Sequence, residues 1–191
     1  MYVSKIPKTI VSLVQPAITS LAARLFVLTS SRPGAARFQP TASTFFETGL
    51  VTALYEFLLM SPVLNHLEIR HEMPYPQGGQ GAPKQVDLWL RPHNGGYAHL
   101  VEAGDFGVGK VHRDLGKIKR INPNGSNWFL SFHRAGAAAA DPWQVVQSSF
   151  ARRNGLDGGR VDADQRLSGS FEVYRPDGQH ETFGYCLLRA K

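Results

Sequence analysis

Cysteine is nearly absent from this 191-residue chain, which contains only Cys186. A single thiol cannot form a disulfide within the chain and cannot supply a zinc site made of several thiolates, so both are excluded. The sequence therefore favours a reducing, intracellular compartment such as the cytoplasm. Hydrophobic residues make up 42% of the chain, which excludes wholesale disorder. A globular domain of this size buries about 70% of the surface of its unfolded chain.

Acidic residues are absent from the first quarter of the chain. Residues 1–46 hold five of the 21 Lys and Arg residues and none of the 15 Asp and Glu residues, so the remainder is close to electrically balanced. The formal net charge of +6 therefore comes mainly from this segment and does not by itself predict nucleic-acid binding. We expect a basic, helical N-terminal extension over residues 1–43, followed by a single domain over residues 44–191.

Hydrophobic runs long enough to cross a membrane are also lacking. The most apolar segment, Ile10 to Leu28, contains Pro16 and Arg24, which make it too polar for a spanning helix. Lys5 and Lys8 precede it, as basic residues precede the apolar part of a secretion signal, and scattered Ser and Arg would equally suit an organelle transit peptide. We favour a helix docked on the domain over either targeting role.

Hydrophobic spacing and turn residues predict the order of the secondary structure. Helices are expected over residues 44–60, 110–121 and 142–153, and strands over residues 67–72, 85–91, 97–105, 127–133, 169–174 and 181–188. The last two strands form a hairpin that turns at Pro176-Asp-Gly178. Helices mixed with strands in this order predict an α/β or α+β domain.

Two carboxylates are predicted to face each other in the sheet. Asn94-Gly95 suits a two-residue type I′ turn, whose central residues both have positive φ. A turn here, or a four-residue loop over residues 93–96, pairs Asp87 with Glu102 on antiparallel strands, with Cβ atoms about 4.5–5.5 Å apart. Such like charges in apolar segments need a cation between them, and oxygen ligands favour Mg²⁺ or Mn²⁺. Alternatively, Asp87 faces solvent at a strand edge and pairs with Arg91 or a nearby Lys.

The first helix of the domain offers a third carboxylate. Glu47 and Glu56 are nine residues apart and therefore about 180° apart around a helix, so only one of them can face the pair. Glu47 shares its stripe with Leu50 and Leu54, so we expect Glu47 to face inward and Glu56 to be solvated. A first-turn acid that interacts favourably with the helix dipole would explain Glu47 equally well.

The helix predicted over residues 110–121 supplies positive charge close to these acids. Its basic residues lie along one edge or beside it: Lys110, Arg113, Lys117, Lys119 and Arg120. Such a stripe can follow the phosphates of a nucleic acid, and a solvated helix face can have the same composition.

Together these residues resemble the PD-(D/E)xK nuclease superfamily, which has the restriction-endonuclease-like fold. Its pattern is an acid on a first helix, an Asp on a strand and Glu-x-Lys on the next strand, followed by a helix and a further strand. Glu47, Asp87 and Glu102 match the acids, and the basic helix resembles the Asp-x-x-Lys-rich helix of many members, over about residues 44–134. The resemblance implies an αβββαβ core whose mixed sheet is flanked by helices, with an added N-terminal helix and a C-terminal helix plus β-hairpin.

The resemblance further implies a metal-dependent nuclease that acts on DNA or RNA. Asp87 and Glu102, together with the Ala103 carbonyl, would bind Mg²⁺ or Mn²⁺, and Glu47 would hold a water molecule or a second ion. The metal would lower the pKa of the attacking water and neutralise the scissile phosphate.

Gly104 departs from the family pattern, because it stands where the lysine of Glu-x-Lys belongs. In this family that lysine orients the attacking water and stabilises the developing charge, which a glycine cannot do. Some members carry the lysine on another element, so we expect Lys117, or otherwise Lys110, to reach back from the following helix. The bases expected to bind flanking phosphates are Lys110, Arg113, Lys119 and Arg120.

The same glycine leaves a second function open, in which a catalytically inactive protein of this fold binds nucleic acid or protein, or associates with itself. A hydrolase built on Ser or Cys with His is the least favoured interpretation. The sequence has no nucleophile-elbow motif, and its seven His residues are scattered.

Overall fold

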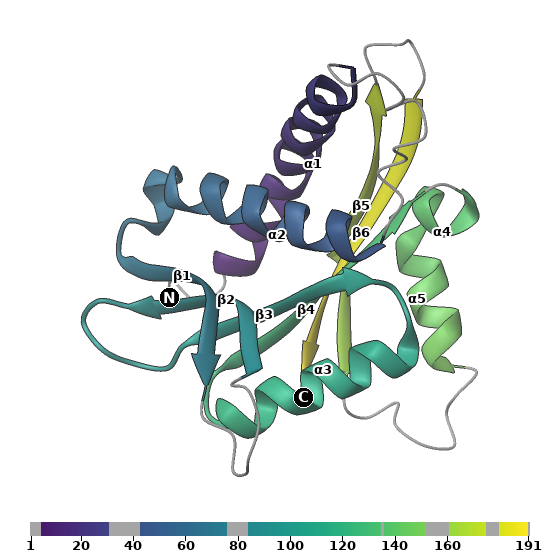
Figure 1. Cartoon of the computed structure of the whole chain (residues 1–191). Coiled ribbons are helices and arrows are strands. Elements are labelled where there is room, and N and C mark those ends of the chain that lie inside the picture. The colour runs from purple at the N-terminus through teal and green to yellow at the C-terminus, as the bar shows by residue number, and fades with distance from the viewer. Residues whose placement is uncertain are drawn as a thin grey trace.

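A computed structural model shows a mixed β-sheet with helices on both of its faces (Figure 1). The structure describes residues 5–30, 43–75, 84–134, 136–151, 161–174 and 180–190. The helices are α1 (Ile6–Ser30), α2 (Ser43–Leu59), the 3-10 helix η2 (Pro62–Leu64), α3 (Val108–Ile121), α4 (Gly136–Ala140) and α5 (Pro142–Ala151). The strands are β1 (Leu67–Tyr75), β2 (Lys84–Pro92), β3 (His99–Asp105), β4 (Ser126–Arg134), β5 (Val161–Tyr174) and β6 (His180–Ala190). This confirms the predicted α/β class, and α4 is a helix that the sequence analysis did not predict.

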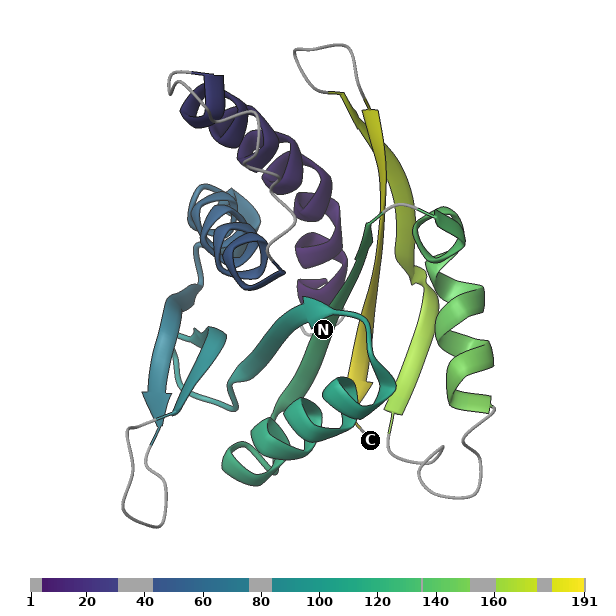
Figure 2. The same cartoon turned by 45° about the vertical axis from the view of Figure 1, so that its right-hand side comes forward.

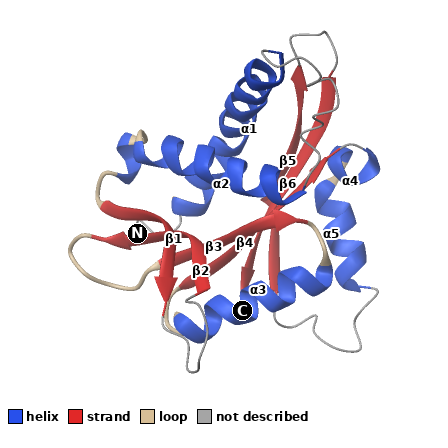
Figure 3. Cartoon of the chain, in the orientation of Figure 1, coloured by secondary structure: helices blue, strands red, loops and turns tan. Residues whose placement is uncertain are grey.

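The sheet has six strands in the order β1-β2-β3-β4-β6-β5 (Figure 3). Only β3 and β4 run parallel, joined by a crossover through α3, and all other neighbours are antiparallel. The predicted C-terminal hairpin is confirmed, and its first strand begins earlier than expected and contains a register shift between Ala163 and Ser168. The turn predicted at residues 176–178 lies outside the described residues.

Each face of the sheet is covered by its own helices (Figure 2). Helices α1 and α2 pack on one face around Leu54, Leu88 and Leu130. Helices α3 and α5 pack on the other face, which is called the α3 face below, around residues such as Ile118 and Phe129. The buried residues of α3 recur at three- and four-residue intervals, as the sequence predicts for an amphipathic helix.

Helix α1 is part of the main core. Ile6, Ile10, Val14 and Ala17 recur every three to four residues and are buried against α2 and the sheet. This agrees with the predicted helix docked on the domain. No helix among the described residues is long and apolar enough to cross a membrane.

The central strands β3 and β4 are buried on both faces, and their apolar residues pack against both layers of helices. Glu102, Ser131 and His133 are polar exceptions in these strands and are also buried. A buried polar group is costly without a partner, so these residues are candidates for a functional site.

Candidate functional site

The pairing of β2 with β3 confirms the predicted register. Leu88 pairs with Val101, and Leu90 pairs with His99. The predicted type I′ turn is wrong, because the positive φ angles fall on Gly95 (85°) and Gly96 (115°) and not on Asn94. The connection between the strands spans residues 93–98 and is longer than a two-residue turn. The residues that it sets opposite each other are nevertheless the predicted ones.

Extending this register by one residue sets Asp87 opposite Glu102. Val86 and Trp89 both pack in the cluster on the α3 face, so the alternation of side chains along β2 is broken at Asp87. The ladder of paired residues ends at Leu88, and beyond it the Ala103 N–H donates a hydrogen bond to Oδ2 of Asp87 at 2.7 Å. Asp87 is half-buried and Glu102 is buried. This differs from the alternative in which Asp87 faces solvent and pairs with Arg91.

The strand on the other side of β2 is also distorted at this position. The β1–β2 register pairs His71 with Leu88 and Met73 with Val86, so Glu72 lies opposite Asp87. Glu72 has a φ of 50°, which is costly for a residue with a side chain. The backbone around Asp87 is therefore irregular toward both neighbouring strands.

Burial and nearby negative charges raise the pKa of both opposed carboxyl groups. Burial, followed by the negative charge of Asp87, raises the pKa of Glu102 to about 8 despite the nearby Lys117 ammonium. Burial also raises the pKa of Asp87, against the effect of the Ala103 hydrogen bond, and the charge of Glu47 raises it further. The two groups are thus fully ionised together only when additional positive charge is close to them.

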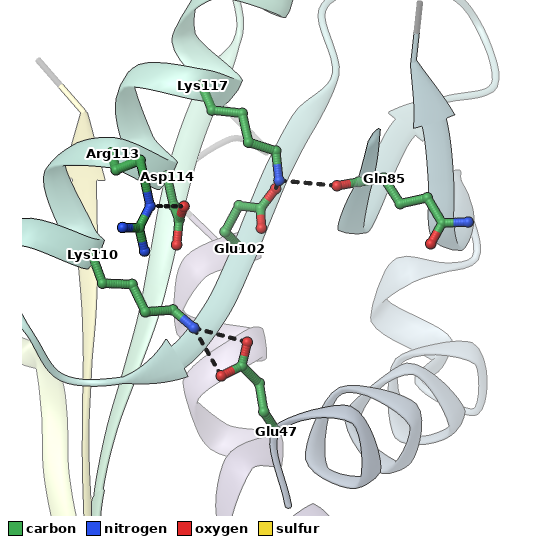
Figure 4. A network of polar contacts seen from close by, with 7 residues as sticks. All are labelled: Glu47, Gln85, Glu102, Lys110, Arg113, Asp114 and Lys117. Atoms are coloured by element: carbon green, nitrogen blue, oxygen red, sulfur yellow. Dashed lines mark hydrogen bonds and ion pairs between the residues drawn. The ribbon is translucent and has the colours of Figure 1, made fainter. Parts of the chain in front are cut away.

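Lys117 reaches both strands from α3, as Figure 4 shows. Its Nζ donates a hydrogen bond to the backbone oxygen of Gln85 at 3.0 Å and lies 2.5 Å from Oε1 of Glu102. The second contact is an ion pair without hydrogen-bond geometry, which leaves Oε1 of Glu102 without a hydrogen bond among the described residues. Lys117 therefore reaches the acid pair, as the sequence analysis expected.

Lys110 occupies the space beside the glycine that replaces the expected strand lysine. Its Nζ donates to both carboxylate oxygens of Glu47, at 2.9 and 2.8 Å. A Cβ atom on Gly104 would overlap this Nζ and would lie 2.5 Å from Cε of Lys110 and 3.0 Å from Oε2 of Glu47. The ammonium group of a helix lysine thus stands where a strand side chain at residue 104 would begin.

Glu47 lies at this site and is engaged by a lysine. Its side chain is 28% exposed, and its charge acts on Asp87, so the predicted inward orientation is confirmed. Glu56 is half-buried, so the expectation that it is solvated is wrong. Helix α2 is apolar around most of its surface, which brings the flank carrying Glu56 partly under cover as well.

Asp114 also belongs to the site, and the sequence analysis assigned it no role there. Lys110, Asp114 and Lys117 are spaced by four and three residues and therefore share one stripe of α3 (Figure 4). The Asp114 side chain is 15% exposed, lies 3.5 Å from Nε of Arg113, and raises the pKa of Glu102 through its charge. The helical spacing was the signal that could have identified it.

The other basic residues of α3 lie further out. Arg113 is 71% exposed, Arg120 is exposed and Lys119 is half-buried. Lys110 differs from them because it is directed at Glu47. Contact of these four residues with phosphates stays a prediction.

A buried Ser–His pair on β4 was not predicted either. Oγ of Ser131 lies 3.1 Å from Nε2 of His133, and Ser131 is paired in register with Gly104. Burial lowers the pKa of His133 to about 4, so its imidazole is neutral near pH 7. The hydroxyl of Ser131 is inaccessible, since the residue is 0% exposed, and burial raises the pKa of Cys186 to about 12. Neither residue is placed to serve as a nucleophile.

A divalent metal would have to be held mainly by the acid pair. Among the described residues, no group of three or more His, Cys, Asp and Glu side chains is arranged to hold a metal ion, so Glu47 does not join Asp87 and Glu102 as a third ligand. The pair nevertheless fits Mg²⁺, which binds through one or two carboxylates and keeps several waters. Oε1 of Glu102 already faces the Lys117 ammonium at 2.5 Å, so an ion bound at this oxygen would have to displace that lysine. Binding by the Ala103 carbonyl stays a prediction.

Comparison with protein-family models, curated proteins and solved structures finds no match for the chain. Its function is therefore argued from the arrangement of its own residues. That arrangement is an opposed pair of carboxyl groups with raised pKa, bordered by two lysine ammonium groups.

Proposed function

We propose that this protein is a metal-dependent nuclease that hydrolyses phosphodiester bonds of DNA or RNA on a core of the restriction-endonuclease-like type. One observation supports this most: the half-buried Asp87 and the buried Glu102 are flanked by Lys117 and Lys110, which both come from the helix that follows Glu102. A purely structural acid pair would not be expected to collect two lysines around a strained and irregular stretch of sheet.

Asp87 and Glu102 would hold Mg²⁺ or Mn²⁺, with the Ala103 carbonyl as a further oxygen ligand. When bound, the ion supplies positive charge to the scissile phosphate and lowers the pKa of a water molecule. The hydrogen bond from the Ala103 N–H fixes the orientation of the Asp87 carboxylate, so that its position does not depend on the ion.

The two lysines have different tasks in this proposal. Lys117 stands 2.5 Å from Glu102 and compensates the charge of that carboxylate. Lys110 places its ammonium beside Gly104, where the family resemblance expects the strand lysine. Lys110 therefore takes the role first assigned to Lys117, which is to stabilise the negative charge that develops on the phosphate. Glu47 holds the Lys110 ammonium in place through two hydrogen bonds.

The test is cleavage of labelled single- and double-stranded DNA and RNA by the purified protein with Mg²⁺ or Mn²⁺. We expect metal-dependent cleavage that Asp87→Asn and Glu102→Gln each reduce by about a hundredfold or more, the scale of removing a preorganised charge at a transition state. Arg134→Gln, at the end of β4, is a control that removes a charge outside the site. Absence of cleavage of every substrate with both metals would overturn the proposal.

A binding module without catalysis is the second candidate, and the Lys117–Glu102 ion pair favours it, because a lysine already neutralises the acid that the metal needs. Such a module would bind nucleic acid or a protein partner, or associate with itself, in the same reducing intracellular setting. A titration with Mg²⁺ separates the two candidates. Thermal stabilisation that disappears in Asp87→Asn supports the enzyme, and no stabilisation supports the module.

A further inference from the structure

A pocket of about 380 Å³ opens next to the acid pair. Its lining is mainly apolar: Met73, Pro74, Val86, Trp89, Ala98, Leu100, Ile121 and Asn122. Val86 directly precedes Asp87, and Leu100 lies two residues before Glu102 on the same face of β3. The pocket and the acids therefore lie side by side.

The sheet register gives the spacing between the pocket and the acids. Arg70, Trp89 and Leu100 form one row across β1, β2 and β3, because Trp89 is paired with both of the others. Glu102 lies two residues beyond Leu100 on the same face of β3, and Asp87 lies on β2 between the pocket residues Val86 and Trp89. At about 3.3–3.4 Å per residue, Leu100 and Glu102 are about 7 Å apart along β3, so the acids directly border the pocket.

The lining has the chemistry of a stacking platform. Trp89 is half-buried, and Cζ of Arg70 lies 5.3 Å from the centroid of its ring. Nε of Arg70 donates to Glu68 at 2.7 Å, which holds the guanidinium near the indole. Ile121 adds an exposed apolar side chain at the other side of the pocket. Aromatic faces with a nearby Arg are what proteins use to bind unpaired bases without sequence preference.

We propose that this pocket receives one unpaired nucleobase, next to the phosphate that lies at Asp87 and Glu102. The inference rests on the proposed nuclease function and names its substrate class: single-stranded nucleic acid, or a strand end that is not base-paired. A base in a duplex is stacked on both sides and paired at its edge, so it reaches the Trp89 ring only after it is unpaired.

Equilibrium binding in Ca²⁺, which takes the same oxygen ligands as Mg²⁺ but with a looser geometry, tests this without relying on cleavage. The probes are a short labelled thymidine oligonucleotide, its duplex with adenosine, and a series in which each nucleotide in turn is replaced by an abasic one. We expect the single strand to bind wild type at least about tenfold more tightly than the duplex, and one abasic position to weaken binding about tenfold. Trp89→Leu loses the sensitivity to that position, and Trp89→Phe keeps most of it.

Trp143→Leu, on α5, is the matched control, because it removes a half-buried Trp from another element. Thermal unfolding checks that all variants are folded. Three results would overturn the pocket assignment. The first is equal affinity for all abasic oligonucleotides, and the second is equal affinity for the single strand and the duplex. The third is the same dependence on the abasic position in the Trp89→Leu and Trp143→Leu variants. If the protein cleaves nucleic acid but binds every abasic oligonucleotide equally well, the pocket assignment fails and the nuclease proposal holds. If binding depends on the abasic position but no cleavage occurs, the pocket assignment holds and the nuclease proposal fails.

Discussion

The glycine at residue 104 and the lysine at residue 110 are expected to function as a unit, and exchanging them tests this. In Gly104→Ala the new methyl group overlaps Nζ of Lys110. The overlapping atoms belong to the flexible end of a side chain, so the lysine moves and the strand does not. We therefore expect Gly104→Ala and Lys110→Ala to impair the same step of catalysis while both proteins remain folded.

The magnitudes separate a catalytic role from a structural one. The side chains of the Lys110–Glu47 ion pair are each 28% exposed, so losing it costs stability on the scale of accessible ion pairs, about 0.2–1 kcal/mol. Loss of a preorganised cation at the phosphate lowers kcat about a hundredfold, equivalent to about 2.7 kcal/mol in the barrier. A large loss of rate with a small change in stability is the expected pattern.

The assay combines single-turnover cleavage with thermal unfolding for four proteins. These are Gly104→Ala, Lys110→Ala, the exchange Gly104→Lys with Lys110→Ala, and Lys119→Ala as a control lysine on the same helix. The exchange returns an ammonium to the site from the strand, so we expect it to recover at least about tenfold of the lost rate. Wild-type rates in both single variants would refute the reasoning and leave Lys117 as the catalytic cation.

Two further predictions concern charge and pH. Arg113→Ala should weaken nucleic-acid binding and reduce the slope of log affinity against log salt by about one, with an unchanged single-turnover rate at saturation; an unchanged slope would exclude a phosphate contact. Because the pKa of Glu102 is raised from 4.5 to about 8, the folded protein binds an extra proton in this range, so this group makes the protein less stable as pH rises. Thermal unfolding should therefore show Glu102→Gln gaining stability over wild type from about pH 5 to pH 8, and a constant difference would contradict the raised pKa.

The order of elements and the position of the acids could be predicted because they depend on short-range rules. The Asp87–Glu102 register depends only on which residues lie opposite each other, so it survived the wrong assignment of the turn at Asn94. Alternation along each strand predicts both side chains on one face, but it does not predict the break in β2 at Asp87, where Val86 shares the α3 face with Trp89. The fixed period of a helix was enough to identify Glu47 as the acid on the inward stripe. It did not predict that Glu56, on the opposite flank, is also half-buried.

The lysine positions could not be predicted in the same way. The side chains of Lys110 and Lys117 have several rotatable bonds, and their ends reach partners that lie far apart in the sequence, Glu47 in one case and Glu102 with Gln85 in the other. Which lysine reaches residue 104 depends on how α3 is seated on the sheet, and the sequence pattern does not give this. The Trp89 pocket also depends on β1, α3 and the β2–β3 pair being placed together.

The charges at the site provide the last argument for a divalent ion. Four carboxyl groups and two lysines meet there: Glu47, Asp87, Glu102, Asp114, Lys110 and Lys117. With every group ionised these six carry two net negative charges, and burial followed by the charge of Asp87 raises the pKa of Glu102. One divalent cation brings the six groups to neutrality, and the exposed Arg113 offers further positive charge to a phosphodiester. The site is thus balanced when the metal is bound, whereas a phosphate alone would increase its negative charge.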